Sequence, residues 1–121
     1  NWLPAVPRDT LDDLCREYGA LLHYSRNEEP VALTLLHAMA AGLPVVTSRP
    51  PRPGAIVIDG RTCLCYDADR PESIARATER LLDDDAVRER LVAEAFASAS
   101  RTCGIDAMTD DWDQLLQDLL P

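Results

Sequence analysis

The chain has 121 residues, of which 46% are hydrophobic and 27% are charged, a balance typical of one soluble globular domain with its own core. Its formal net charge of -9 argues against nucleic acid or an anionic membrane as a partner, because phosphate groups are bound mainly by Lys and Arg. No apolar run is long enough to span a membrane, and the first residues lack the features of a signal peptide.

Helices and strands are expected to alternate over the first two thirds of the chain. Residues 8–18 place apolar side chains at helical spacing, and the apolar run 20–24 predicts a strand buried on both faces. Residues 31–41 predict a helix that is apolar all round and packed inside the domain. The β-branched run 45–47 predicts a second buried strand.

The remaining elements follow a segment rich in proline. Residues 48–54 contain three prolines, which excludes both a helix and a strand. A turn at 59–60 precedes a third strand over 62–66. Helical patterns then cover about 71–83, 84–100 and 105–120.

This order predicts an α/β fold, a parallel doubly wound sheet with flanking helices and a helical C-terminal tail. We expect a single domain over residues 1–121, which alternates over about 1–70 and is helical over about 71–121. Ligands of such sheets bind at the carboxyl ends of the strands, which here points to the loops 25–30 and 47–54.

The chain contains four cysteines, Cys15, Cys63, Cys65 and Cys103. Their spacing does not fit a zinc knuckle, so the sequence predicts no metal site. We expect reduced thiols in a cytoplasmic protein and assign them no chemistry.

The start of the expected helix 31–41 is a candidate anion site. Its first-turn amides have no partner within the helix, and its dipole is positive there, which suits a phosphate. Thr34 and His37 are its only polar side chains and lie on one face, one turn apart. Two alternatives stay open: Glu29 complements the helix dipole, and His37 lies at the edge of the core with a backbone partner.

The segment EPVALTLLHAMAAGLPVV, residues 29–46, resembles the nucleotide-sugar-binding segment of retaining GT-B glycosyltransferases, family 4 (glycosyl transferases group 1). Residues 6–30 resemble the helix, strand and loop that precede this segment in the family, and residues 56–91 resemble the turn, strand and helices that follow. The resemblance implies a Rossmann-like C-terminal domain, one half of a two-domain enzyme, that binds the sugar donor.

The resemblance also implies roles for individual residues. Glu29 matches the family's first glutamate, which contacts the donor sugar near the reacting carbon, and is the implied catalytic residue. Ala32, Leu33 and Thr34 match the helix start whose amides face the donor's phosphate and sugar. His37 stands where the family's second glutamate holds the ribose hydroxyls; a neutral imidazole makes one such hydrogen bond, whereas a carboxylate accepts from both.

A second departure from the family lies in the loop after residues 45–47. The family's Gly-Gly-x-Pro-Glu turn is replaced by Pro-Arg-Pro-Gly-Ala at residues 51–55. Arg49 and Arg52 lie in this loop, and guanidinium groups bind phosphate through paired hydrogen bonds. The alternative is that both are solvated loop arginines.

The function implied for a full-length relative is transfer of a hexosyl group from a nucleotide-diphosphate sugar, with retention and without a metal or other cofactor. The basic clamp and the acceptor domain of that family are not in this sequence, which also lacks an initiator Met, so we expect a fragment that is inactive alone. The alternative is a degenerate, non-catalytic GT-B-like domain with an interaction or assembly role. Exposed apolar surface is expected to meet a second copy or a missing N-terminal domain.

Overall fold

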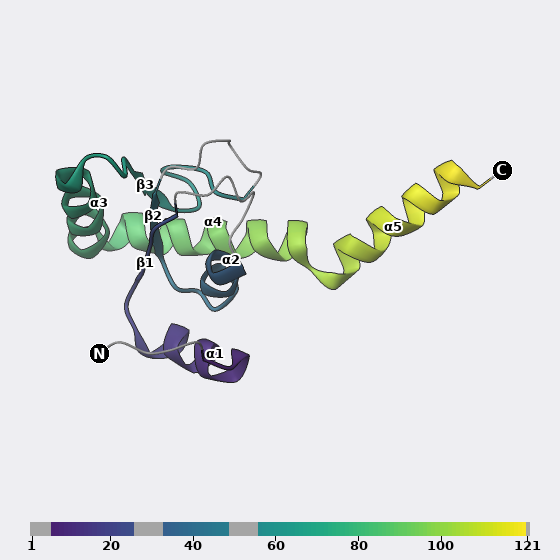
Figure 1. The fold of residues 1–121 in the computed structure, drawn as a ribbon, viewed down its shortest axis with the longest axis horizontal. Coiled ribbons are helices and arrows are strands. Elements are labelled where there is room, and N and C mark those ends of the chain that lie inside the picture. The colour runs from purple at the N-terminus through teal and green to yellow at the C-terminus, as the bar shows by residue number, and fades with distance from the viewer. Residues whose placement is uncertain (1–5, 26–32, 49–55, 121) are drawn as a thin grey trace.

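A computed structural model of the chain describes residues 6–25, 33–48 and 56–120. Over these residues the chain forms a parallel sheet in the order β1-β2-β3, flanked by helices, and a last helix that projects away from the rest (Figure 1). In chain order the elements are α1 (Arg8–Glu17), β1 (Leu21–His23), α2 (Leu33–Ala40), β2 (Val45–Ser48), β3 (Leu64–Tyr66), α3 (Pro71–Asp83), α4 (Asp85–Cys103) and α5 (Ile105–Leu119). The predicted α/β fold class, with its helical C-terminal tail, is confirmed.

Strand β2 is the centre of the described sheet, and all four of its residues are buried. Because neighbouring residues of a strand point to opposite faces, β2 contributes to two separate apolar clusters. Val45 packs in the cluster that contains Leu35 and Met39 of α2, whereas Val46 packs with Leu81 of α3. The sheet is therefore covered on both faces at β2, as expected of parallel strands.

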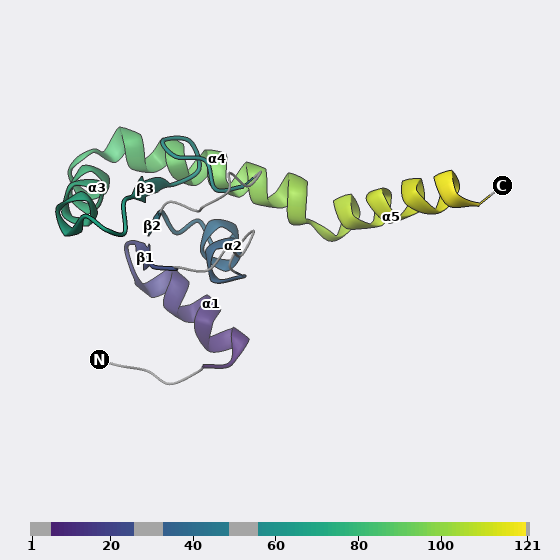
Figure 2. The same cartoon turned by 45° about the horizontal axis from the view of Figure 1, so that its top comes forward.

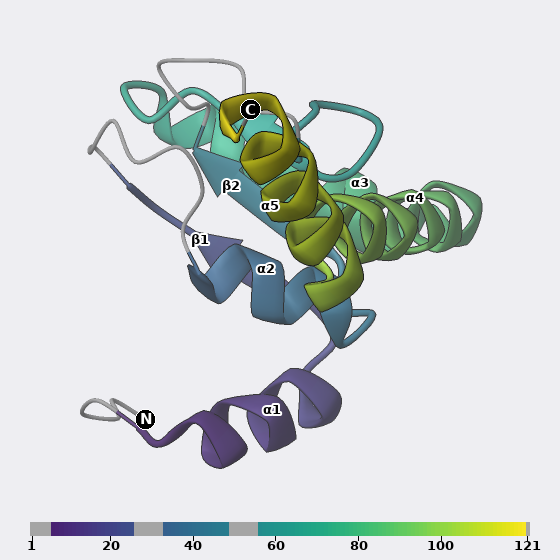
Figure 3. The ribbon, with the colours of Figure 1, turned by 90° about the vertical axis from the view of Figure 1, so that its right-hand side faces the viewer.

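Helix α4 lies along the sheet and contributes to both clusters. Leu91 packs in the cluster of Val46, and Ala95 and Ala99 pack in the cluster of Val45. Helix α2 lies between α1 and the sheet (Figure 3). Because β1 and β2 pair in parallel, their carboxyl ends lie side by side.

The prediction that residues 20–24 form a strand buried on both faces is wrong. Strand β1 spans only Leu21–His23, and the side chain of Leu22 is 56% exposed. Leu22 is in register with Val46, so both lie on the face that α3 covers. Helix α3 packs against β2 and β3 on that face, which leaves β1 at the uncovered margin.

Two further elements differ from the prediction. Helix α2 is apolar but buries only one side, since Leu33 is 73% exposed. Residues 31–32 of the predicted helix lie outside the described residues. The helix is followed by Gly42 at a φ of 74°, a left-handed conformation that glycine adopts readily. Strand β3 begins at Leu64 rather than at residue 62, and the Thr62 side chain holds the preceding loop.

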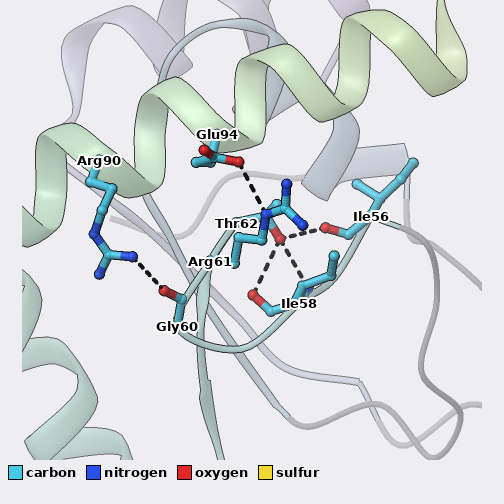
Figure 4. A network of polar contacts seen from close by, with 7 residues as sticks. All are labelled: Ile56, Ile58, Gly60, Arg61, Thr62, Arg90 and Glu94. Carbon is cyan, nitrogen blue, oxygen red and sulfur yellow. Dashed lines mark hydrogen bonds and ion pairs between the residues drawn. The ribbon is translucent and has the colours of Figure 1, made fainter.

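The loop 56–62 is fixed by side chains from within it and from α4 (Figure 4). The buried Thr62 hydroxyl donates to the backbone oxygen of Ile56 and accepts from the backbone N–H of Ile58 at 2.9 Å. From α4, Arg90 donates to the Gly60 oxygen at 3.0 Å, and Glu94 pairs with Arg61 at 3.1 Å. These contacts hold the chain where it enters β3.

Helix α5 extends beyond the sheet and its covering helices (Figure 2). It is amphipathic, yet none of its residues is buried. Large apolar side chains are exposed along it and just beyond its end: Ile105, Met108, Trp112, Leu115, Leu116, Leu119 and Leu120. Among the helices of the described ranges, none has the length and apolar character needed to cross a membrane.

Candidate functional site

The carboxyl ends of the three strands carry a network of polar side chains. His23 Nδ1, at the end of β1, lies 3.0 Å from Thr47 Oγ1 on β2. The Ser48 hydroxyl accepts from the Ser25 N–H and donates to the Ser25 oxygen, both at 3.0 Å. Tyr66 Oη, at the end of β3, donates to the His23 backbone oxygen at 2.9 Å.

This network compensates for the burial of polar groups at the sheet edge. Thr47, Ser48 and Tyr66 are all buried, and an unsatisfied polar group there would destabilise the fold. Burial raises the pKa of the Tyr66 phenol, and the nearby Tyr24 raises it further, so Tyr66 stays neutral and keeps its proton for donation.

The network also fixes where the two predicted binding loops begin. The loop after β1 starts beside Ser25, and the loop after β2 starts beside Ser48, so the hydrogen bonds between these serines hold the two starting points together. Ser25, Thr47 and Ser48 lie in the binding loops predicted from the sequence, but Tyr66 was not predicted. A signal was present, since Tyr66 is an amphipathic residue at the end of a short apolar strand.

Four of the predicted site residues, Glu29, Ala32, Arg49 and Arg52, lie outside the described residues, so their arrangement stays a prediction. Leu33 and Thr34 begin α2, where Leu33 is exposed and Thr34 is half-buried. His37 and Leu33 line a hollow beside α2.

His37 has a partner from another helix. Its Nδ1 lies 3.6 Å from Asp12 Oδ1 of α1, and its side chain is 22% exposed. The alternative interpretation placed His37 at the edge of the core with a backbone partner. The burial of His37 agrees with it, but the partner in this contact is the Asp12 carboxylate.

The hollow beside His37 has a volume of about 470 Å³ and lies between α1, α2 and the end of α4. Leu33 and Leu36 supply apolar wall, while Arg8 and Ser100 supply polar groups. Small-molecule sites of this volume are common, and they combine apolar walls with a few polar groups. Within residues 6–25, 33–48 and 56–120, no group of three His, Cys, Asp or Glu side chains is placed to hold a metal ion.

Comparison with known proteins assigns the chain to a family. The family model described as glycosyl transferases group 1 matches residues 1–97. The chain belongs to this family. The resemblance found in residues 29–46 is thereby confirmed, and the chain is a GT-B domain of the group 1 glycosyltransferase family.

Curated relatives of this chain come from bacteria. It is 33% identical over 92 residues to the lipopolysaccharide core biosynthesis glycosyltransferase LpsE of Rhizobium meliloti, a match that covers 76% of the chain and 27% of the relative. It is 33% identical over 99 residues to the D-inositol 3-phosphate glycosyltransferase of a Nocardioides species, covering 82% of the chain and 21% of the relative.

A solved structure agrees with these relatives. Sucrose-phosphate synthase from Thermosynechococcus elongatus superimposes with a TM-score of 0.62 at 28% identity, covering 75% of this chain and 23% of the synthase. The chain thus spans about a quarter, or less, of the length of the proteins it matches.

Proposed function

We propose that this chain is the donor-binding portion of a retaining glycosyltransferase that transfers a hexosyl group from a nucleotide-diphosphate sugar. One observation carries the proposal: β1 and β2 are adjacent and parallel, and the Ser25–Ser48 hydrogen bonds hold their exits together. The segments with the predicted sugar- and phosphate-binding residues therefore leave from the same sheet edge, where α/β folds bind ligands.

The proposal assigns the roles that the family resemblance implies. Glu29 faces the donor sugar near the reacting carbon, and the amides of Ala32, Leu33 and Thr34 face its phosphate. Arg49 and Arg52 bind the diphosphate from the neighbouring loop, where positive charge stabilises the leaving group as the bond to the sugar breaks. The alternating portion, about residues 1–70, carries the site, and the helical portion, about 71–121, supports it.

His37 is proposed to contact the ribose. The support is its position beside a hollow large enough for a nucleoside, which Leu33 and Arg8 also line. Its single accessible hydrogen-bonding function predicts a weaker grip on the two ribose hydroxyls than a glutamate would give.

Because the chain covers 27% or less of its curated relatives, we propose that it binds a donor but does not transfer sugar by itself. We further propose a cytoplasmic setting, in keeping with the predicted reduced thiols. The exposed apolar face of α5 is available to either expected occupant, a second copy or an N-terminal domain.

A second candidate is a non-catalytic domain with an interaction or assembly role. One described observation favours it: the residue that replaces the family's second glutamate lies 3.6 Å from a carboxylate of the same chain, that of Asp12.

Calorimetric titration with UDP-, GDP- and ADP-sugars separates the two candidates. We expect binding of at least one donor, weakened by Glu29→Gln and by Arg52→Ala. The matched control is Arg80→Ala, an exposed arginine on α3, which should leave affinity unchanged. A folded sample that gives no heat with any donor favours the interaction role.

A further inference from the structure

Two cysteines with no role in the proposed function lie in contact with each other. Cys63 immediately precedes β3 and Cys65 is the second residue of the strand, and both side chains pack in the same apolar cluster. Their sulfur atoms are 3.8 Å apart. Cys63 is fully buried, whereas Cys65 is partly exposed.

We propose that Cys63 and Cys65 are a redox-active dithiol that closes to a disulfide within the strand by exchange with a low-molecular-weight disulfide such as oxidised glutathione. The two sulfur atoms are already in contact, and a disulfide bond of about 2.05 Å requires an approach of less than about 2 Å. Cys15 and Cys103 lie on other elements, on α1 and at the end of α4. This inference is independent of the proposed sugar-donor function.

Because Cys65 is the more exposed of the two residues, it reacts first with the external disulfide. The accessible Cys65 thiolate attacks one sulfur of the external disulfide, whose S–S bond breaks and releases one thiol. The Cys63 thiolate then attacks Cys65 Sγ, and the second thiol leaves. Two protein thiols are oxidised by two electrons, and one small disulfide is reduced to two thiols.

The hydrogen bond with Cys65 lowers the pKa of the Cys63 thiol in the reduced pair, and burial opposes this effect. This hydrogen bond is lost once Cys65 has formed the mixed disulfide, because its sulfur then carries no hydrogen. The second step therefore depends on the short distance between the two sulfur atoms.

Closure of the disulfide has a structural consequence. Residues i and i+2 of an extended strand have Cα atoms about 6.6–6.8 Å apart, at the upper limit that a disulfide tolerates, so β3 must bend. Cys65 pairs with Thr47 in the sheet, and the next residue is Tyr66, whose hydroxyl reaches His23. Oxidation should therefore loosen the β2–β3 pairing at the carboxyl edge.

The test uses the chain with Cys103→Ser, which removes the exposed thiol. The protein is equilibrated in buffers with different ratios of oxidised to reduced glutathione. Each sample is then quenched with acid, alkylated and analysed by mass spectrometry. We expect a species lighter by two hydrogens, with Cys63 and Cys65 both protected from alkylation and the original mass restored by a reductant. The oxidised species should melt at a lower temperature.

Single-cysteine variants test the order of attack. Cys63→Ser and Cys63→Ala should both accumulate a glutathione adduct on Cys65, at least tenfold more than the chain with both thiols. Cys65→Ser should stay unmodified at Cys63. Complete alkylation of both thiols at every glutathione ratio in a folded sample would overturn the proposal, as would a disulfide that includes Cys15. An oxidised form that melts no lower than the reduced form overturns the coupling to the sheet edge.

Discussion

Tyr66, the last residue of β3, donates its phenolic hydrogen to the backbone oxygen of His23, the last residue of β1, at 2.9 Å. Strand β2 lies between these two strands, so the bond links the outer strands across the end of the middle one. The carboxyl edge, from which the predicted binding loops leave, is therefore held by side chains as well as by the sheet.

Replacing Tyr66 by Phe should destabilise the fold. The change removes one buried hydrogen bond and leaves the His23 oxygen without that donor, which costs about 1–3 kcal/mol of unfolding free energy. Chemical denaturation measures this cost. The control is Tyr18→Phe, since Tyr18 is 57% exposed and should change stability by less than about 0.5 kcal/mol.

The raised pKa of Tyr66 predicts a loss of stability at alkaline pH. The folded protein holds the phenolic proton more tightly than the unfolded chain, so this stabilisation is complete below the unfolded pKa of about 10 and is lost as pH rises through the folded pKa. Melting curves from pH 8 upward should show the decline, and it should be smaller in Tyr66→Phe. Identical alkaline profiles for the two proteins would contradict the assignment.

Thr62 should matter for its hydroxyl rather than for its size. Thr62→Val keeps the shape but leaves the Ile58 N–H and the Ile56 oxygen without the hydroxyl, and we expect a cost of about 1–3 kcal/mol. Thr62→Ser keeps both hydrogen bonds and serves as the matched control. Equal unfolding free energies for the Val and Ser variants would show that the loop does not depend on these bonds.

Helices α4 and α5 should respond differently to the same substitution. Leu91→Ala on α4 creates a cavity in a cluster that contacts β2 and β3, at about 2–5 kcal/mol. Leu115→Ala on α5 should cost less than about 0.5 kcal/mol, because Leu115 is 46% exposed and α5 buries none of its residues. Denaturant titrations at low protein concentration measure both, and a large loss at Leu115 would reveal a packing partner.

His37→Glu restores the glutamate that the family pattern has at this position, but it brings a carboxylate close to Asp12. We therefore expect donor affinity to improve only when Asp12→Asn is added, with a coupling of about 0.5–3 kcal/mol between the two sites in a double-mutant cycle. Asp13→Asn is the control, since Asp13 instead pairs with Arg16. Additive effects at positions 12 and 37 would argue against ribose binding there.

The sequence predicted the order and type of the elements because their local signals were strong. The β-branched run at β2, the proline at the first residue of α3 and the helical spacing of Ile74, Ala77 and Leu81 each agree with the structure. Exposure of Leu22 was not predictable in this way, because an apolar run does not reveal whether a helix covers the margin of the sheet.

The site was harder to predict because its geometry depends on pairs that are distant in sequence. The family pattern identified His37, but nothing local to His37 indicates Asp12 on another helix. Tyr66 and His23 are likewise 43 residues apart, and only the strand order brings them together. The contact between Cys63 and Cys65 was accessible in principle, since alternate residues of a strand share a face.

The junction between α4 and α5 has no room for a side chain at Gly104. A methyl group in place of a hydrogen on Gly104 would lie 2.5 Å from the Ser100 oxygen, much closer than such atoms can approach. A larger residue at position 104 would therefore displace the backbone at the junction of α4 and α5. The direction in which this helix carries Trp112 and its apolar neighbours is thus set by the smallest residue in the chain.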